Sequence, residues 1–329
     1  MSLQTSSSLS SNKPQTPVQF SILNYNVNFV YTRDGLGDSN SMMVYKAILE
    51  SGADLVCLQE THQGYEQFLL NYNNQELARL YPYHVFYTHG GSGGMALLSK
   101  FEFVENSEEC LTLRENGVEG SWFPMHLNRV RVPIGKHSTL NHSTEFVEIQ
   151  LVNIHLRPPL NDDGSATLWT AYMTNQYRLN EVQYLVSHFE KKKILQSSTE
   201  PLTSGDHTKI FKQPRIPIIM LGDYNEHDHD PALTFLTKEC LYRNESTETL
   251  TPLFRDALNE FVPQTRETHR WPLKFLWGKI TYWSYKRLDH CVYSVNNLKC
   301  TSCKVMDGYE DNASDHQPVL STFALEFFQ

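Results

Sequence analysis

The sequence predicts an α/β fold built as a four-layer sandwich, in which two packed mixed β-sheets are flanked by helices. Two observations support this prediction. Apolar runs of strand length alternate with segments of helical spacing along nearly the whole chain. These runs are also more numerous than a single doubly wound sheet needs, and a Gly-rich phosphate-binding loop does not accompany them.

Strands are expected where short apolar runs end in polar residues. In the first half of the chain we expect strands at 20–26, 53–60, 93–99 and 146–155. Helices are expected between them at 39–51 and 65–80. Gly52 and Pro82 follow these two segments and are typical of helix ends. The polar, acidic stretch 105–144 is expected to hold outer strands and a surface loop.

The second half is organised around the apolar run 217–222, which has the character of a strand buried on both faces. A long helix is expected at 168–195, because its apolar side chains share one face. Asp230 and Thr251 each precede a proline, which is typical of a helix start. The helix that begins at Thr251 is expected to run through Glu260. Further strands are expected at 287–294 and 319–327.

The bulk composition is that of a soluble globular protein. The 329 residues are 40% hydrophobic and 20% charged, which is enough to bury a sizeable core. The net charge of −9 excludes a general-purpose basic nucleic-acid binder. An enzyme of this charge acting on a phosphate ester would therefore need a metal ion or local Lys and Arg side chains. We find neither a membrane-spanning run nor the apolar core of a signal peptide.

The chain is expected to form one domain. Residues 1–17 are rich in Ser, Thr, Gln and Asn and are predicted to be a disordered leader, and residues 18–329 show no break in composition. The six cysteines are scattered, which fits a reducing compartment. We therefore expect an intracellular protein, cytoplasmic or nuclear, that works as a monomer without an obligate protein partner.

The predicted strands share one feature, which is a polar side chain of a chemically useful type at one end. These residues are Asn26, Glu60, His155, Asp223, Asn225, Asp289, Asp315 and His316. If the strand ends converge, the carboxylate and amide oxygens suit Mg²⁺, with Mn²⁺ possible. Such an ion polarises a phosphoryl oxygen and helps to orient an attacking water. Taken singly, Asp289 could instead cap a turn and His155 could be a hydrogen-bonded core histidine.

Two other kinds of hydrolase were weighed. A zinc enzyme would need His227 and His229 as ligands, but no Cys/His cluster has the usual ligand spacing, and a solvated turn is the commoner reason for such a cluster. Cys300 and Cys303 form only half of a zinc or redox motif. A serine hydrolase is disfavoured because the sequence contains no Gly-x-Ser-x-Gly motif.

Five blocks of sequence together resemble the signatures of the endonuclease/exonuclease/phosphatase superfamily, which has the DNase I-like fold. They are Leu58-Gln59-Glu60, Asn153-Ile154-His155-Leu156, Gly222-Asp223-Tyr224-Asn225, Leu288-Asp289-His290 and Ser314-Asp315-His316-Gln317-Pro318. The blocks occur in the order typical of the family and span Phe20 to Phe327. The resemblance implies that 18–329 is a single catalytic domain, a metal-dependent hydrolase of phosphate esters.

Matched position by position, the resemblance implies a metal site and a set of catalytic groups. Glu60 would be the principal metal carboxylate, with Asn26 beside it and Asp315 near the metal or its waters. The catalytic residues would be His155, Asp223, Asn225, Asp289 and His316.

The resemblance also implies a role for each catalytic residue. Asp223 would position or deprotonate the attacking water, and Asn225 would donate hydrogen bonds to the phosphorane oxygens. His316, oriented by Asp289, would stabilise the transition state or protonate the leaving group. His155 would contact the phosphate from the other side.

The branch of the superfamily is indicated by departures from the apurinic endonucleases. Those enzymes carry Trp and Tyr where this chain has Tyr25 and His155. The chain therefore resembles the His-bearing branches, which include tyrosyl-DNA phosphodiesterases, DNase I-like nucleases and neutral sphingomyelinases. A phosphodiesterase or nuclease is favoured, with nucleic acid preferred over lipid as substrate.

Alternatives remain within the superfamily and outside it. A phosphoinositide phosphatase or a sphingomyelinase is the alternative within the class. A non-catalytic binding protein on the same scaffold is the alternative from another class. Such a protein should have lost side chains of the Glu60, Asp223 or His316 type, and this chain keeps all three.

Substrate contacts are predicted at two places. Arg157, just after His155, could clamp a phosphate bidentately or could be an ordinary rim arginine. The segment 266–287 interleaves aromatic and basic residues and is expected to be a loop over the site, with Trp277 and Trp283 stacking on bases. The alternatives for this segment are a cover for the core and a membrane contact.

Overall fold

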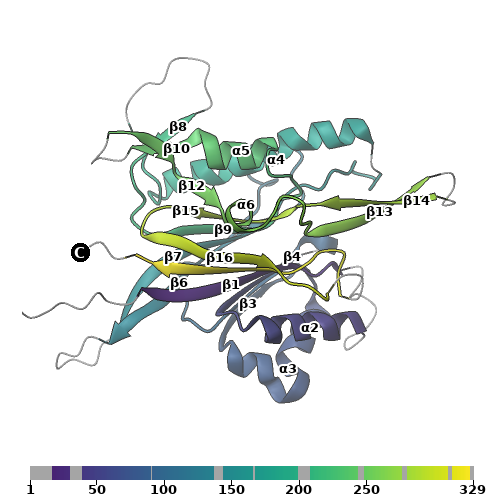
Figure 1. The fold of residues 1–329 in the computed structure, drawn as a ribbon, viewed down its shortest axis with the longest axis horizontal. Coiled ribbons are helices and arrows are strands. Elements are labelled where there is room, and N and C mark those ends of the chain that lie inside the picture. Colours follow the sequence, from purple (N-terminus) through teal and green to yellow (C-terminus); the bar gives the residue numbers. More distant parts are fainter. Residues whose placement is uncertain are drawn as a thin grey trace, which may run out of the picture.

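The computed structural model describes residues 17–29, 39–89, 91–136, 144–165, 167–198, 208–243, 248–275, 280–309 and 313–326. In these residues two six-stranded sheets pack face to face, and helices cover both outer faces (Figure 1). The predicted four-layer α/β sandwich is confirmed. The predicted disordered leader, apart from Pro17, lies outside the described residues.

The first sheet has the strand order β16-β17-β1-β2-β4-β3. Its strands are β1 (Val18–Asn26), β2 (Leu55–Thr61), β3 (Tyr83–Tyr87), β4 (Gly94–Ser99), β16 (Leu298–Val305) and β17 (Val319–Leu325). Strands β1 and β2 are parallel, and the other pairs are antiparallel. The helices α2 (Ser39–Ser51) and α3 (Gln63–Leu80) supply the apolar side chains that cover its outer face.

The second sheet has the order β12-β15-β9-β7-β6-β5. Its strands are β5 (Glu109–Leu111), β6 (Met125–Lys136), β7 (Thr144–His155), β9 (Ile218–Asp223), β12 (Phe254–Asp256) and β15 (Asp289–Ser294). Here β7 and β9 are the parallel pair. The helices α4 (Leu168–Lys191) and α5 (Pro231–Thr234) cover its outer face, and α5 continues into a π-helical turn at Phe235–Glu239.

Three apolar clusters hold the four layers together. One lies between the two sheets and includes Phe20, Leu151 and Phe323, while the others lie between each sheet and its helices. The fully buried β9, with all six residues inaccessible to solvent, fits the expectation of a strand covered on both faces. The strand ends that carry the predicted site residues are therefore mounted on a rigid scaffold.

Smaller elements complete the chain. Strands β8 (Lys209–Phe211), β10 (Cys240–Arg243) and β11 (Leu250–Pro252) form a three-stranded sheet, and α6 is a single helical turn at Ala257–Phe261. Strands β13 (His269–Phe275) and β14 (Ile280–Lys286) form a hairpin that projects from the right-hand end of the molecule in Figure 1. A short 3-10 turn at Gly91–Gly93 precedes β4.

Two predicted segments were wrong. The helix expected from Thr251 to Glu260 is instead β11, β12 and the short α6. Leu253 and Phe254 are buried in the core, so this part of the segment is extended. The helix begins only after Asp256, whose side chain accepts a hydrogen bond from the Leu258 amide at 3.1 Å. The loop expected at 266–287 is the β13–β14 hairpin.

The long helix α4 also ends at Lys191 rather than at Leu195. Lys193 has a positive φ of 58°, and the amides of Ile194 and Leu195 turn back to the Phe189 carbonyl.

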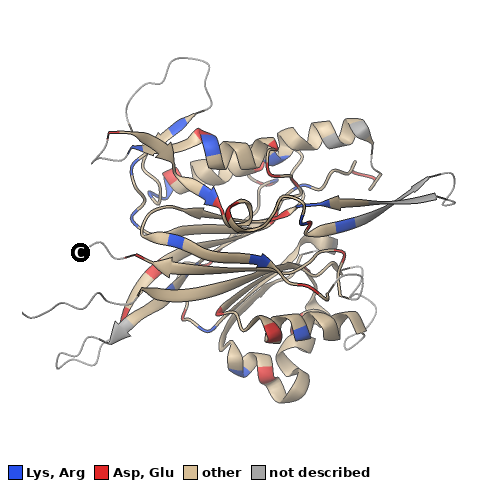
Figure 2. Cartoon of the chain, viewed as in Figure 1, with Lys and Arg blue, Asp and Glu red and all other residues tan. Residues whose placement is uncertain are grey.

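Two further features concern the described part of the chain. In the described part of the chain, no helix is both long enough and apolar enough to cross a membrane. Basic and acidic residues are interspersed over the described sheets and helices (Figure 2). Binding of an anionic substrate therefore depends on the groups at the site itself.

Candidate active site

The predicted site residues converge at one edge of the sandwich because of strand direction. The parallel strands β1 and β2 of one sheet, and β7 and β9 of the other, all end there. Strands β15 and β17 run antiparallel to β9 and β1, so they begin at the same edge. In the second sheet the register pairs Asp223 with His155 on one side and with Asp289 on the other. Three functional side chains therefore stand in one row.

Close strand packing explains the glycine before Asp223. Gly222 has a φ of 152°, and a Cβ built there would lie 1.8 Å from the Ile154 carbonyl oxygen. A side chain at this position would push β7 away from β9. Glycine is needed because the two strands approach closely next to the catalytic row.

Asn26 joins the two sheets at the centre of the site. Its Nδ2 donates to Glu60 Oε1 at 3.0 Å and to Asp223 Oδ2 at 3.1 Å. Glu60 lies at a β-bulge and has a positive φ of 58°, an uncommon conformation for a non-glycine residue that is typical of functional sites. The Phe29 amide donates to the other oxygen of Glu60 at 3.3 Å.

Asp315 lies on the same side of the site as Asn26. Asn28 Nδ2 donates to Asp315 Oδ1 at 2.7 Å, and the Asn28 amide donates to Asn26 Oδ1 at 3.0 Å. Burial would raise the pKa of Asp315, but hydrogen bonding from His269 and the charge of His316 outweigh burial and lower it to about 2. Asp315 is therefore an ionised carboxylate.

The site concentrates buried carboxylates, which fits a bound cation. Burial raises the pKa of Glu60 to about 7 and that of Asp223 to about 7. Both groups would ionise more readily beside a positive ion, and their oxygens together with the Asn26 amide are the ligands that hard divalent cations prefer. Glu60, Asn26 and Asp315 remain the predicted ligands. In the described residues, the groups at this edge whose carboxylate and His atoms lie close enough to share an ion are Asp223, Asp289 and His316, and His269, Asp315 and His316; neither contains Glu60.

The pair Asp289–His316 has the geometry of an oriented catalytic histidine. His316 Nδ1 lies 2.8 Å from Asp289 Oδ2, and its Nε2 lies 3.6 Å from Asp223 Oδ2. Burial opposes protonation of His316, but the charges of Asp289 and Asp223 outweigh it and raise the pKa of His316 well above its usual range. The imidazole is therefore a proton donor aimed at the Asp223 side of the site.

His155 closes the opposite side of the site. Its Nε2 lies 3.8 Å from Glu60 Oε1 and 3.7 Å from Asp223 Oδ2, and its ring stacks on Phe123 with centroids 4.1 Å apart. Burial, together with the charge of His316, lowers the pKa of His155 to about 3. The two histidines therefore differ in charge, one neutral and one protonated.

Asn225 is placed directly over Asp223. It has a positive φ of 51°, its amide donates to Asp223 Oδ1 at 2.8 Å, and its Nδ2 donates to the Leu156 carbonyl at 3.1 Å. The structure thus gathers all eight residues predicted as catalytic or metal-binding at one edge. The individual roles of these residues stay predictions.

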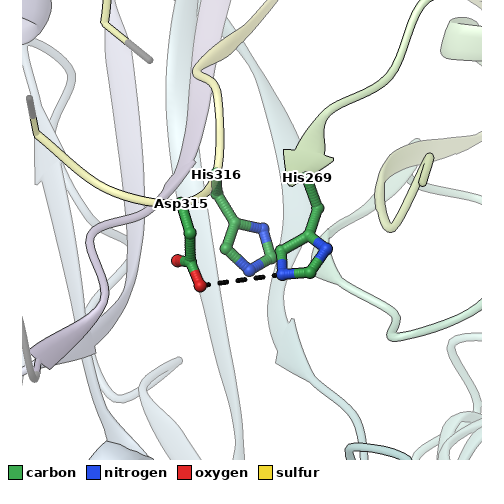
Figure 3. A group of neighbouring side chains, drawn as sticks. All are labelled: His269, Asp315 and His316. Atoms are coloured by element: carbon green, nitrogen blue, oxygen red, sulfur yellow. Dashed lines mark ion pairs between the residues drawn. The ribbon is translucent and has the colours of Figure 1, made fainter. Parts of the chain in front are cut away.

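Sequence reasoning missed His269, which begins β13. Figure 3 shows its ring beside His316 and its Nε2 toward Asp315, with an Nε2–Oδ2 distance of 3.7 Å. The His269 and His316 ring centroids are 4.5 Å apart. The hydroxyl of the neighbouring Thr268 accepts a hydrogen bond from the Asp289 amide at 3.1 Å. The available signal was again a polar pair at a strand end, but the segment was interpreted as a loop.

Of the predicted substrate-binding residues, the structure describes the side chain of Arg157 alone. Arg157 is 3% exposed, and its guanidinium donates to the carbonyls of Gly120 and Leu160 and to Asp162 at 2.8–3.0 Å. These contacts hold it within the protein beside the site. Trp277 lies outside the described residues, and so does the side chain of Trp283.

The zinc alternative finds no support in the described residues. The groups of side chains that could hold a metal there contain neither His227 nor His229. One of these groups, Asp228, Asp256 and His290, lies beside Arg287, whose Nε donates to Asp228 at 3.0 Å. A cation already neutralises that carboxylate.

Comparisons with known proteins agree with this fold. A family model described as the Endonuclease/Exonuclease/phosphatase family matches residues 23–178. TDP2 from C. elegans aligns with a TM-score of 0.55 at 13% identity, covering 93% of this chain and 75% of that chain. The human Nocturnin catalytic domain with bound sulfate anion aligns with a TM-score of 0.53 at 15% identity, covering 95% of each chain.

A functionally unknown conserved protein from Enterococcus faecalis V583 also aligns, with a TM-score of 0.56 at 14% identity over 93% of this chain and all of that chain. No curated protein matches the sequence. At these identities the solved structures establish the fold, while the family model covers three of the eight site residues, Asn26, Glu60 and His155.

Fold, site and family match define a phosphoric ester hydrolase with the DNase I-like fold. Residues 23–178, just under half of the chain, match the Endonuclease/Exonuclease/phosphatase family model, and the fold is similar to that of the solved TDP2 and Nocturnin structures.

Proposed function

We propose that this protein is a Mg²⁺-dependent phosphodiesterase of the nuclease type, which hydrolyses a phosphodiester in a nucleic acid or at its end by in-line attack of an activated water. The observation that carries the proposal is the bridge from Asn26 to both Glu60 and Asp223, with the Asp289–His316 pair beside it. This arrangement supports a cation site, a base and an acid that act at one point.

A divalent cation held by Glu60, Asn26 and Asp315 would polarise a phosphoryl oxygen. Mg²⁺ is favoured because the donor atoms are oxygens from carboxylates and an amide. The binding of this ion would also favour the ionised forms of Glu60 and Asp223, whose pKa values burial raises to about 7.

The protein's own groups divide the proton chemistry between them. Ionised Asp223 orients the water and accepts its proton, and protonated His316 donates a proton to the leaving oxygen. The amide of Asn225 would exchange its 3.3 Å contact with Asp223 Oδ2 for a phosphoryl oxygen. Neutral His155 contacts the phosphate without adding charge.

The proposed setting follows from the same features. All six cysteines are free thiols, which supports a reducing intracellular compartment, cytoplasmic or nuclear. We infer a monomer, because one chain supplies every group of the site. The nucleic-acid preference draws support from the alignment with TDP2 from D. rerio complexed with single strand DNA product, which has a TM-score of 0.50 at 16% identity.

A substrate panel tests the proposal. With Mg²⁺ present, turnover is measured on single- and double-stranded DNA, RNA, phosphotyrosyl-ended DNA, sphingomyelin and phosphoinositides. We expect hydrolysis of a nucleic-acid substrate that disappears in EDTA and in Glu60→Gln. Glu102→Gln is the control, since it makes the same change at a side chain that is 56% exposed. Faster turnover of sphingomyelin or a phosphoinositide would contradict the proposed nuclease activity and assign a lipid substrate. Absence of turnover on the whole panel would favour a binding protein.

A further inference from the structure

A cavity of about 510 Å³ lies beside the catalytic edge. Its lining includes Trp122, Arg157, Trp169 and Tyr177. A chain of rings connects it to the reacting centre: His155 stacks on Phe123, and Trp122, the next residue, packs edge-on against Phe123 with centroids 6.1 Å apart. A substrate whose phosphate lies at His155 therefore has its next group beside this cavity.

One wall of the cavity is preorganised around Arg157. The guanidinium stacks over Trp122 at 3.6 Å, and three hydrogen bonds to Gly120, Leu160 and Asp162 fix its orientation. Its Nε is buried and makes no hydrogen bond within the described residues. The wall is thus an immobile flat cation whose orientation is fixed by the protein.

Gly120 brings the backbone against an aromatic face of the same cavity. It has a φ of 77°, and a Cβ there would lie 2.5 Å from ring carbons of Tyr177. The ring of Tyr177 therefore packs directly against the backbone at Gly120. Its rigidity lowers the entropic cost of binding a second flat group.

The mouth of the cavity exposes unusually large apolar rings. Trp169 and Tyr172 lie in the first turns of α4, pack against each other with centroids 5.7 Å apart, and are both 69% exposed. In Figure 1 this end of α4 lies at the same end of the molecule as the β13–β14 hairpin. Exposed aromatic pairs beside a cavity are typical of a binding surface.

We propose that this cavity is a subsite for a nucleobase, which belongs to the nucleotide adjoining the scissile phosphate. The proposal rests on the nuclease function proposed above and specifies its substrate. A base offers a flat face to Trp169 and Tyr177 and polar edge groups to the wall that contains the Arg157 guanidinium. An acyl chain has neither a flat face nor polar groups for this wall, and an inositol ring has no aromatic face to stack.

Binding of the product tests the subsite without turnover. Affinities for deoxyadenosine monophosphate and deoxyribose 5-phosphate are measured by calorimetry with Mg²⁺ present. We expect the nucleotide to bind about 5- to 100-fold more tightly than the sugar phosphate, from stacking of one base. Trp169→Ala, and Met173→Trp, which fills the cavity, should abolish this difference. Phe146→Ala is the control, because Phe146 is a 46% exposed ring near the start of β7, at the opposite end of that strand from His155, and does not line the cavity.

Kinetics with an abasic substrate separate the two proposals. KM is compared for a short single strand and for the same strand lacking the base next to the cleaved bond. Equal KM values, or equal affinities for the two phosphates, would overturn the subsite while leaving the nuclease intact. Base-dependent binding that Trp169→Ala removes, without hydrolysis of any nucleic acid, would keep the subsite and overturn the nuclease. Thermal unfolding of each variant confirms that the loss is not a folding defect.

Discussion

At the scale of single residues, Asp223 is the centre of the site. It receives hydrogen bonds from Asn26 and from the Asn225 amide, and it faces both histidines at 3.6–3.7 Å. Its charge is disfavoured by burial and favoured by protonated His316. The state of this one carboxyl therefore depends on the cation site and on the acid at once.

Without a bound cation, the buried carboxylate of Glu60 should lower the free energy of unfolding. Because burial raises the pKa of Glu60 from 4.5 to about 7, its contribution to folding stability falls as pH rises from about 4.5 to 7. In EDTA at pH 8, Glu60→Gln should therefore be more stable than the wild type by about 1–3 kcal/mol, while its activity with Mg²⁺ drops by orders of magnitude. Denaturant unfolding with and without Mg²⁺ measures this, and a less stable variant in EDTA would contradict it.

The Asp289–His316 pair should behave as a unit. Asp289→Asn removes the charge that keeps His316 protonated, so it should cost most of the kcat lost in His316→Ala, and the double variant should lose little more. Single-turnover rates for the two single variants and the double variant provide the test. Losses that multiply would show that the two residues act independently.

At the scale of elements, strand register does the positioning. The pairs Asp289↔Asp223 and His155↔Asp223 place side chains from β15, β9 and β7 in one row, although they come from distant parts of the chain. The sequence pattern of apolar runs predicts each strand but not which residues stand side by side. A one-residue slip would turn these side chains to the other face of the sheet.

Gly222→Ala should damage this register. The new Cβ would meet the Ile154 carbonyl, so β7 and β9 must separate, and we expect a loss of about 3 kcal/mol or more in stability together with most of the activity. Gly164→Ala is the control, because Gly164 also has a positive φ, 80°, but no atom lies within 4 Å of the added carbon. It should cost only about 1 kcal/mol. Similar losses in both would assign the effect to backbone conformation alone.

At the scale of the whole molecule, a buried charge network supports the site from behind. Arg178 of α4 donates to Glu226 at 3.1 Å and to the Arg157 carbonyl at 2.9 Å. His290 of β15 contacts Asp256 at 2.8 Å and the Glu226 carbonyl at 3.0 Å. The network thus ties the outer helix to the strands that carry Asp223 and Asp289.

This network predicts a pH-dependent stability. Burial would lower the pKa of His290, but the charge and hydrogen bond of Asp256 outweigh burial and raise it to about 9. The stabilisation is fully present below pH 6.5 and is lost as pH rises through 9, with a magnitude of about 3 kcal/mol. The stability difference between wild type and His290→Gln should therefore shrink between pH 6.5 and pH 9. Thermal unfolding across this range measures it, and a constant difference would rule out the ionic contribution.

Features that depend on local signals could be predicted from the sequence. The helix at Ser39–Ser51 was predicted at its observed bounds, because Gly52, with its φ of 61°, ends it locally. Apolar runs likewise predicted β1, β2, β7 and β9, and the polar residues at their ends indicated the catalytic set. The strand β3 was not predicted, and the segment 251–260 was misassigned, because burial against distant residues outweighed the local pattern.

Only the tertiary structure decided which of these residues meet. Asn26 and Asp223 are 197 positions apart, and their 3.1 Å contact depends on how two sheets pack. His269 joins Asp315 and His316 through the β13–β14 hairpin, and Arg157 faces a cavity wall rather than the centre. Helix ends and strand runs are encoded over a few neighbouring residues, whereas the geometry of a site depends on contacts between elements whose positions no local pattern specifies.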